Sequence, residues 1–208
     1  MDVIFDVDGT LWDSTDVVAE SWNAAIFDKT GQHAHLNGAK LKQLFGKTME
    51  EIGLLMLPNL DSNKRAEVCQ ACYDYEDEIL AKKAGIFYDG VKETLEKLAT
   101  KYNLYVVSNC QIGYIDTVLN HLGMKDKFKD FLCYGDTLKP KGETLKILMQ
   151  KNNITKAIYV GDTQGDFDAC KVAGIPMIFA SYGFGSVQNP DYTINDIKEL
   201  PELLAKLA

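Results

Sequence analysis

The sequence contains no apolar run long enough to cross a bilayer, and it has no excess of positive charge. Its 22 lysines and arginines stand against 30 aspartates and glutamates, which gives a formal net charge of −8. A surface of this sign does not neutralise a nucleic-acid backbone or an anionic membrane, so we expect neither partner. No basic region, long apolar segment or cleavage site precedes the strand-like residues Val3 to Phe5, so we expect a cytoplasmic protein that is not exported.

Cysteine is scarce and odd in number, with five residues among 208. A chain of this length does not need disulfide staples, so reduced thiols are expected. Cys69 and Cys72 form a CxxC pair, but no second pair matches it and the segment around it has helical character. We interpret the pair as two thiols on a helix face rather than as a redox or zinc site.

Five short apolar segments alternate with helical patterns along much of the chain. They are residues 2–7, 104–107, 131–134, 157–160 and 176–180. This alternation predicts an α/β fold with a doubly wound, Rossmann-like parallel sheet that is covered on both faces. Between residues 15 and 86 helical patterns follow one another without a strand, and Gly46 interrupts one of them. We therefore predict a core of residues 1–14 and 87–208 with an inserted helical cap domain at residues 15–86.

Four aspartates lie at the carboxyl ends of two of the predicted strands. The first strand ends in the segment that contains Asp6 and Asp8, and Asp162 and Asp166 come just after the fourth. Ligands of a parallel sheet lie beyond the carboxyl ends of its strands, so we expect these carboxylates to meet at one edge. Like charges gathered in this way resist ionisation unless a cation compensates them. Because Mg²⁺ prefers oxygen ligands and often bridges carboxylates to a phosphate, the sequence predicts a magnesium site and a phosphorylated substrate.

Groups that could hold such a phosphate follow other strands. Ser108 and Asn109 end the second strand and offer a hydroxyl and a backbone N–H beside the start of a helix. Lys139 and Lys141 precede another helix, where a fixed ammonium would stabilise charge in a transition state. A single Asp-x-Asp is also compatible with a turn or a helix cap, and a single Ser-Asn pair is mostly a helix N-cap, so the prediction depends on their combination.

Together these groups resemble the four sequence motifs of the haloacid dehalogenase superfamily. The motif residues are Asp6-Val7-Asp8-Gly9-Thr10-Leu11, Ser108-Asn109, Lys141, and Gly161-Asp162 with Asp166. Their order and strand-end placement match as well, and the helical insert is similar to the cap of the phosphoglycolate phosphatase-like branch. The resemblance implies a Mg²⁺-dependent phosphatase of small phosphate monoesters that works through an aspartyl-phosphate intermediate on Asp6.

The same resemblance implies a role for each motif residue. Asp6 becomes the nucleophile and a metal ligand, while Asp8 protonates the leaving oxygen, later activates water, and touches the metal through its carbonyl. Asp162 becomes a metal ligand, and Asp166 binds the metal directly, binds it through water, or orients the lysine. The residues expected to contact the substrate's phosphoryl group are Thr10, Ser108, Asn109 and Lys141.

Two lysines carry open alternatives. Lys141 resembles the third-motif lysine of phosphoserine phosphatase-like members, and Lys139 before Pro140 resembles the lysine of other branches; we favour Lys141. In the cap, Lys47 follows Phe45-Gly46 in a segment that resembles the loop facing the active site in relatives. Lys47 is therefore a candidate contact for the remote part of the substrate, and a plain surface turn is the alternative.

The reaction and the substrate also leave alternatives. Asp8 favours a phosphatase over a dehalogenase, because an ester oxygen needs a proton on leaving and a halide does not. A phosphomutase resembling β-phosphoglucomutase would share every core motif, and so would a non-catalytic phosphometabolite-binding protein. Phosphoglycolate, sugar phosphates and nucleotides all stay open as substrates, because cap side chains choose the leaving group. We expect a monomer whose partner is a small-molecule phosphate ester.

Overall fold

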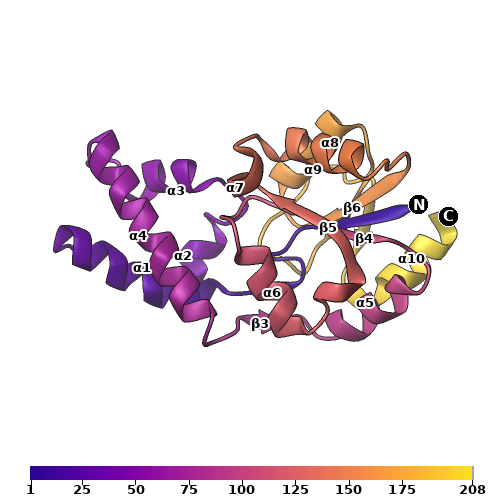
Figure 1. Ribbon diagram of the computed structural model, residues 1–208, viewed down its shortest axis with the longest axis horizontal. Helices are drawn as coiled ribbons and strands as arrows, with labels where there is room; N and C mark the ends of the chain where they lie inside the picture. Colours follow the sequence, from indigo (N-terminus) through magenta and orange to yellow (C-terminus); the bar gives the residue numbers. More distant parts are fainter. Residues whose placement is uncertain (208) are drawn as a thin grey trace. The chain divides into compact units, whose positions relative to one another are not determined.

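The computed structural model describes residues 1–207 (Figure 1). The chain divides into two compact units. The first, which we call the core unit, comprises Met1–Asp13 and the chain from Phe87 onward, and the second, which we call the helical unit, comprises Ser14–Ile86. Each is described separately below.

The core unit is built on a six-stranded parallel sheet. In spatial order its strands are β5 (Phe128–Cys133), β4 (Leu104–Ser108), β1 (Asp2–Phe5), β6 (Ala157–Gly161), β7 (Met177–Ala180) and β8 (Tyr192–Ile194). Neighbouring strands pair in parallel throughout. The chain adds strands on one side of β1 and then on the other, which confirms the predicted doubly wound fold. In such sheets ligands bind where the strand order reverses, here beside β1.

Helices cover both faces of this sheet. Those on one side are α8 (Lys141–Lys151) and α9 (Gln164–Ala173), and those on the other are α5 (Val91–Ala99), α6 (Tyr114–Leu122) and α10 (Leu200–Leu207) (Figure 1). Alternate residues of neighbouring strands, such as Ile4, Tyr105 and Tyr159, pack with Leu145 and Phe167 from the α8 and α9 side. Burial of each large apolar side chain contributes about 1.5–3 kcal/mol, which holds the strand ends in place.

The shortest elements have no periodicity to reveal them. The edge strand β8 has three residues, of which only Ile194 is buried, and it was not predicted. Strands β2 (Trp12–Asp13) and β3 (Ile86–Phe87) form a separate two-stranded sheet. The remaining short elements of the core unit are η1 (Lys125–Lys127), α7 (Tyr134–Thr137) and η2 (Ile197–Glu199).

The helical unit consists of four helices. They are α1 (Thr15–Thr30), α2 (Gly38–Lys42), α3 (Met49–Met56) and α4 (Ser62–Leu80). Gly46, at φ +87°, lies between α2 and α3, and Thr48 with Glu51 forms a capping box that starts α3. The long α1 and α4 pack together, and the buried Trp22 indole donates a 2.7 Å hydrogen bond to Glu76 Oε2.

The structure bears on two further expectations. All five cysteines are free and buried, as expected for reduced thiols, and Cys69 and Cys72 lie on α4. Among residues 1–207, no helix combines the length and the apolar character that a membrane span requires.

Candidate active site

The register of the sheet brings three candidate residues to one edge. β1 pairs in parallel with β4 on one side and with β6 on the other. Asp6 follows the last residue of β1, Ser108 is the last residue of β4, and Asp162 follows the last residue of β6. The Asp6 backbone N–H donates to the Val160 carbonyl at 2.9 Å, which fixes the backbone at this point.

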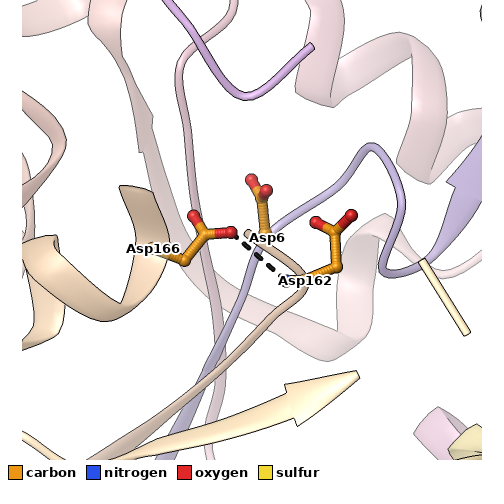
Figure 2. A group of neighbouring side chains, drawn as sticks. All are labelled: Asp6, Asp162 and Asp166. Atoms are coloured by element: carbon orange, nitrogen blue, oxygen red, sulfur yellow. Dashed lines mark hydrogen bonds between the residues drawn. The ribbon is translucent and has the colours of Figure 1, made fainter. Parts of the chain in front are cut away.

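Three aspartates form a buried cluster at this edge. Asp6, Asp162 and Asp166 have exposed fractions of 2%, 0% and 0%. One carboxylate oxygen from each lies within 4.8 Å of the others, and Figure 2 shows the three carboxyl groups side by side. Lys141, the first residue of α8, is also buried, and its Nζ lies 3.1 Å from Asp6 Oδ1 and 2.6 Å from Asp166 Oδ1. Two of the three carboxylates thus contact one ammonium group, so the cluster is negative when all are ionised.

Asp166 has both carboxylate oxygens engaged in hydrogen bonds. Oδ1 accepts from Lys141 Nζ, while Oδ2 accepts from the backbone of Asp162 at 3.2 Å (dashed in Figure 2) and from the Thr163 N–H and hydroxyl at 2.9 and 2.7 Å. The Thr163 contacts are a capping box that starts α9. Burial would raise the pKa of Asp166, but Lys141 and Thr163 outweigh it and hold that pKa below its ordinary value. These contacts favour the alternative in which Asp166 orients the lysine.

Asp6 and Asp162 are in the opposite situation. Burial raises the pKa of Asp6 to about 6 against the opposing effect of Lys141, and burial raises the pKa of Asp162 well above its ordinary value, with Asp166 adding to the effect. Asp162 Oδ2 accepts from the Phe184 N–H at 2.7 Å, but its Oδ1 is buried and accepts no hydrogen bond within the described chain. A buried carboxylate oxygen without a partner is costly, and a divalent cation would remove that cost. The all-oxygen donor set fits Mg²⁺.

The turn after β1 explains the glycine of the first motif. Gly9 has φ +80°, and a Cβ at this position would collide with the Asp162 carboxylate, so glycine is required on both counts. The next residue, Thr10, has a buried Oγ1 that finds no partner among residues 1–207, and its carbonyl accepts from the Tyr182 hydroxyl at 3.0 Å. A buried hydroxyl without a partner in the turn after β1 is compatible with the predicted role of Thr10 in holding a phosphoryl oxygen.

The carboxylate of Asp8 is held by two aromatic residues. Its Oδ1 accepts from the Trp12 indole N–H at 3.1 Å and from the Tyr114 hydroxyl at 2.6 Å. Neither Trp12 nor Tyr114 is among the site residues that the sequence predicted. The available signal was weak, because a tryptophan or tyrosine that packs in a core is far more common than one that serves a site.

The remaining candidates differ in how the structure places them. Asn109 follows Ser108 and is half-buried. Lys139 is exposed on the segment before α8, whereas Lys141 is buried against two aspartates, which favours Lys141 as the motif lysine. Lys47 belongs to the helical unit, where it is exposed and donates to the Gln43 carbonyl at 3.1 Å. Its contact with a substrate stays a prediction.

Comparison with known proteins places this arrangement in a family. The family model for haloacid dehalogenase-like hydrolases matches residues 3–180, which is most of the chain. The chain therefore belongs to the haloacid dehalogenase-like hydrolases, and it is an enzyme of that class.

More particular relatives point to one branch. The chain is similar to a protein named phosphoglycolate phosphatase from Vibrio vulnificus strain YJ016, with 29% identity over 97% of this chain and 95% of the relative. It is also 29% identical to a phosphoglycolate phosphatase from Haemophilus influenzae strain 86-028NP, over 96% of each chain. It is phosphoglycolate phosphatase-like in this sense.

Solved structures agree on the fold. A crystal structure from Haemophilus somnus 129pt, described as a predicted phosphoglycolate phosphatase, superposes with a TM-score of 0.86 at 23% identity, covering 98% of this chain and 97% of that one. A haloacid dehalogenase-like hydrolase from Streptococcus pneumoniae gives a TM-score of 0.82 at 20% identity, covering 99% and 97%. At these identities the likeness establishes the fold.

Proposed function

We propose that the protein is a Mg²⁺-dependent phosphatase of a small-molecule phosphate monoester, with an aspartyl-phosphate intermediate on Asp6. One observation carries the proposal: the buried Asp6 carboxylate stands at the sheet edge beside Lys141 and Asp162, with Asp8 two residues further on. A nucleophile, a fixed cation, a candidate metal ligand and a proton donor are thereby supplied by one edge of one sheet.

The reaction proceeds in two displacements. A carboxylate oxygen of Asp6 attacks phosphorus, and the bond to the ester oxygen breaks as Asp8 gives that oxygen a proton. A water molecule then attacks the phosphoryl group on Asp6, Asp8 takes back a proton, and inorganic phosphate leaves. Lys141 forms an ion pair with Asp6 and stabilises negative charge on the phosphoryl group as it is transferred. Ser108 and Thr10 offer hydroxyl donors to the oxygens of that phosphoryl group.

The acidic cluster provides the metal site in this proposal. Asp6 and Asp162 would hold Mg²⁺ together with the Asp8 carbonyl, and the unpartnered Asp162 Oδ1 is the atom that most needs such a cation. When bound, the ion neutralises charge on the carboxylates and on the phosphoryl oxygens. Asp166, whose oxygens already accept hydrogen bonds, would support the site by fixing Lys141.

The relatives favour a particular substrate. Both similar bacterial proteins are named phosphoglycolate phosphatase, and their similarity runs over nearly the whole chain. We therefore propose phosphoglycolate as the first substrate to test, followed by sugar phosphates and nucleoside monophosphates. In this proposal residues of the helical unit, Lys47 among them, form a cap that selects the leaving group and excludes water.

The test is release of inorganic phosphate from these esters with Mg²⁺, with chelator, and with an Asp6→Asn variant. Magnesium-dependent turnover that is lost in the variant supports the proposal. The matched control is Asp168→Asn, because Asp168 is an exposed aspartate on α9 and should leave turnover unchanged. Wild-type inactivity on every ester, or turnover retained by Asp6→Asn, would contradict it.

A mutase shares the first displacement and returns the phosphoryl group to a second hydroxyl of the sugar. The two reactions separate by product, since a mutase yields an isomerised sugar phosphate and little free phosphate. The same assay can therefore be run on sugar phosphates with the isomer and the phosphate both quantified.

A further inference from the structure

The carboxylate of Asp8 receives two hydrogen bonds on the same oxygen. Trp12 and Tyr114 both donate to Oδ1, and both donors are almost fully buried, with exposed fractions of 0% and 2%. Their rings pack edge to face with centroids 5.9 Å apart, and the Trp12 ring lies 5.4 Å from that of Phe87. Neither donor can turn away without disturbing the packing around it, so the Asp8 carboxylate is held in one orientation.

The two donors reach Asp8 from different parts of the core unit. Trp12 lies in β2, four residues after Asp8, whereas Tyr114 is the first residue of α6 and is 106 positions away. Gly113, at φ +91°, forms the N-cap of α6 and sets the start of the helix that carries Tyr114. A phenylalanine at position 114 would fill nearly the same space as Tyr114, so packing alone does not require the O–H there.

We propose that Trp12 and Tyr114 are positioning residues that aim the Asp8 carboxyl at the leaving group. The inference rests on the proposed phosphatase function and names residues that serve its proton donor. Because Oδ1 accepts two hydrogen bonds, the transferable proton is carried by Oδ2. It passes from Oδ2 to the ester oxygen as the P–O bond breaks and the Asp6–P bond forms, and Oδ2 later accepts a proton from the attacking water.

Leaving-group dependence distinguishes this role from a structural one. The p-nitrophenolate of p-nitrophenyl phosphate leaves without a proton, whereas the alkoxide of an alkyl phosphate needs one. The ratio kcat/KM covers only the steps up to phosphorylation of Asp6, in which Asp8 serves as the acid. In Tyr114→Phe we expect kcat/KM to fall about ten- to a hundredfold for an alkyl phosphate and to change less than about threefold for p-nitrophenyl phosphate.

Two further variants complete the comparison. Trp12→Phe should show the same selective loss, since it removes the other donor and keeps an aromatic ring. The matched control is Tyr105→Phe, because Tyr105 is a buried tyrosine near the amino end of β4, opposite Asp130 in the sheet and away from the carboxyl ends of the strands. This variant should leave kcat/KM unchanged for both the alkyl phosphate and p-nitrophenyl phosphate.

The outcomes decide the inference. An equal fall in kcat/KM for both substrates would overturn it in favour of a structural role. A rise in kcat/KM for the alkyl phosphate would also overturn it, because the two hydrogen bonds would then hold Asp8 in an orientation that it must leave before it reacts.

Absence of wild-type turnover would count against the proposed function, and the positioning contact is then judged without turnover. The chemical shift of the Trp12 indole N–H in a nitrogen–proton NMR spectrum should change in Tyr114→Phe and in Asp8→Asn. The indole N–H of Trp22, which is hydrogen-bonded to Glu76, should keep its chemical shift. An unmoved Trp12 signal would overturn the inference.

Discussion

Asp162 and Asp166 lie four residues apart and are equally buried, yet the surroundings of Asp166 stabilise its charged form and those of Asp162 destabilise it. Asp166 receives an ammonium, two backbone N–H groups and a hydroxyl, which together outweigh its burial. Asp162 receives one backbone N–H from Phe184 and has two carboxylates nearby. At the scale of single residues, one aspartate is stabilised as an anion by the fold and the other is stabilised only if a cation joins it.

This contrast predicts opposite effects of the same substitution. In chelator at about pH 8, Asp162→Asn should not lower the Tm, because it removes a group whose charge is disfavoured. Asp166→Asn should cost about 3 kcal/mol or more, a fall in Tm of roughly 6–12 °C, because it leaves buried donors unpaired. Thermal unfolding measured by circular dichroism checks both, with Asp168→Asn on exposed α9 surface as the control. A larger loss from Asp162→Asn would contradict the assignment.

The two lysines before and at the start of α8 give a second residue-scale prediction. Lys141→Met should lower kcat about 10²- to 10³-fold, since a preorganised ammonium beside the transferring phosphoryl group is lost. Lys139→Met should change kcat less than about threefold because Lys139 is exposed. Phosphate release measures both variants.

Lys141→Met also strips a buried counter-charge from Asp6 and Asp166 and can weaken the fold. Lys141→Arg therefore accompanies it, since it keeps the charge but not the compact ammonium group. A larger loss from Lys139→Met than from either Lys141 variant would show that the other lysine of the pair serves the motif.

At the scale of elements, the sequence predicted the strands that are marked by a short apolar run, together with the polar residues at their carboxyl ends. The strands that carry Asp6, Ser108 and Asp162 are short apolar segments, and the parallel register then places those residues at one edge without further information. The fold class follows from the same alternation of strand and helix. By contrast, β8 was missed because three residues with one buried side chain carry no period.

Contacts made by the backbone or across long separations stayed out of reach. The Phe184 N–H that binds Asp162 is a group that almost every residue possesses, so no residue type announces it. Tyr114 meets Asp8 only because α6 begins where it does, 106 positions along the chain. Sequence patterns specify elements and their faces, whereas these contacts depend on how elements are placed in space.

Within the helical unit, the pairing of α1 with α4 includes a buried polar contact that can be tested. Trp22→Phe removes the indole donor from the buried Glu76 carboxylate and should cost about 1–3 kcal/mol of unfolding free energy. Urea unfolding measures the loss, and Gln70→Ala, on the exposed face of α4, is the control. An unchanged midpoint in Trp22→Phe would mean that the contact contributes little to the pairing of α1 with α4.

At the scale of the whole molecule, the formal charge of −8 sets a problem for an enzyme that acts on a phosphate ester. A chain with this net charge repels an anion at long range, within the limit set by salt screening. The acidic cluster of the described residues adds to that repulsion, since it brings three carboxylates together and the single ammonium group of Lys141 offsets only part of their charge. Metal binding is therefore expected both to stabilise the fold and to make the site receptive to an anion.

The dependence of metal stabilisation on pH follows from the pKa values. The ordinary pKa of Asp6 is 3.8 and its folded pKa is about 6, so between these values the folded chain binds more protons than the unfolded chain. The free energy of unfolding contributed by Asp6 therefore falls as pH rises through that window and stays low above it; Asp162 acts in the same direction. Asp166 has the opposite sign, and its contribution is lost only in acid.

In the proposed site Mg²⁺ would bind the deprotonated carboxylates, so it should raise the Tm more at about pH 8 than at about pH 5. At a concentration of about 100 times its Kd the expected gain is roughly 2.7 kcal/mol, or about 5–10 °C, at the higher pH. Thermal unfolding with Mg²⁺ and with chelator at both pH values measures it, and Asp162→Asn should lose most of the gain while Asp168→Asn keeps it. Equal gains at the two pH values would mean that Mg²⁺ binds away from the titrating cluster. No gain at either pH would contradict a Mg²⁺ site at the acidic cluster of the protein without substrate.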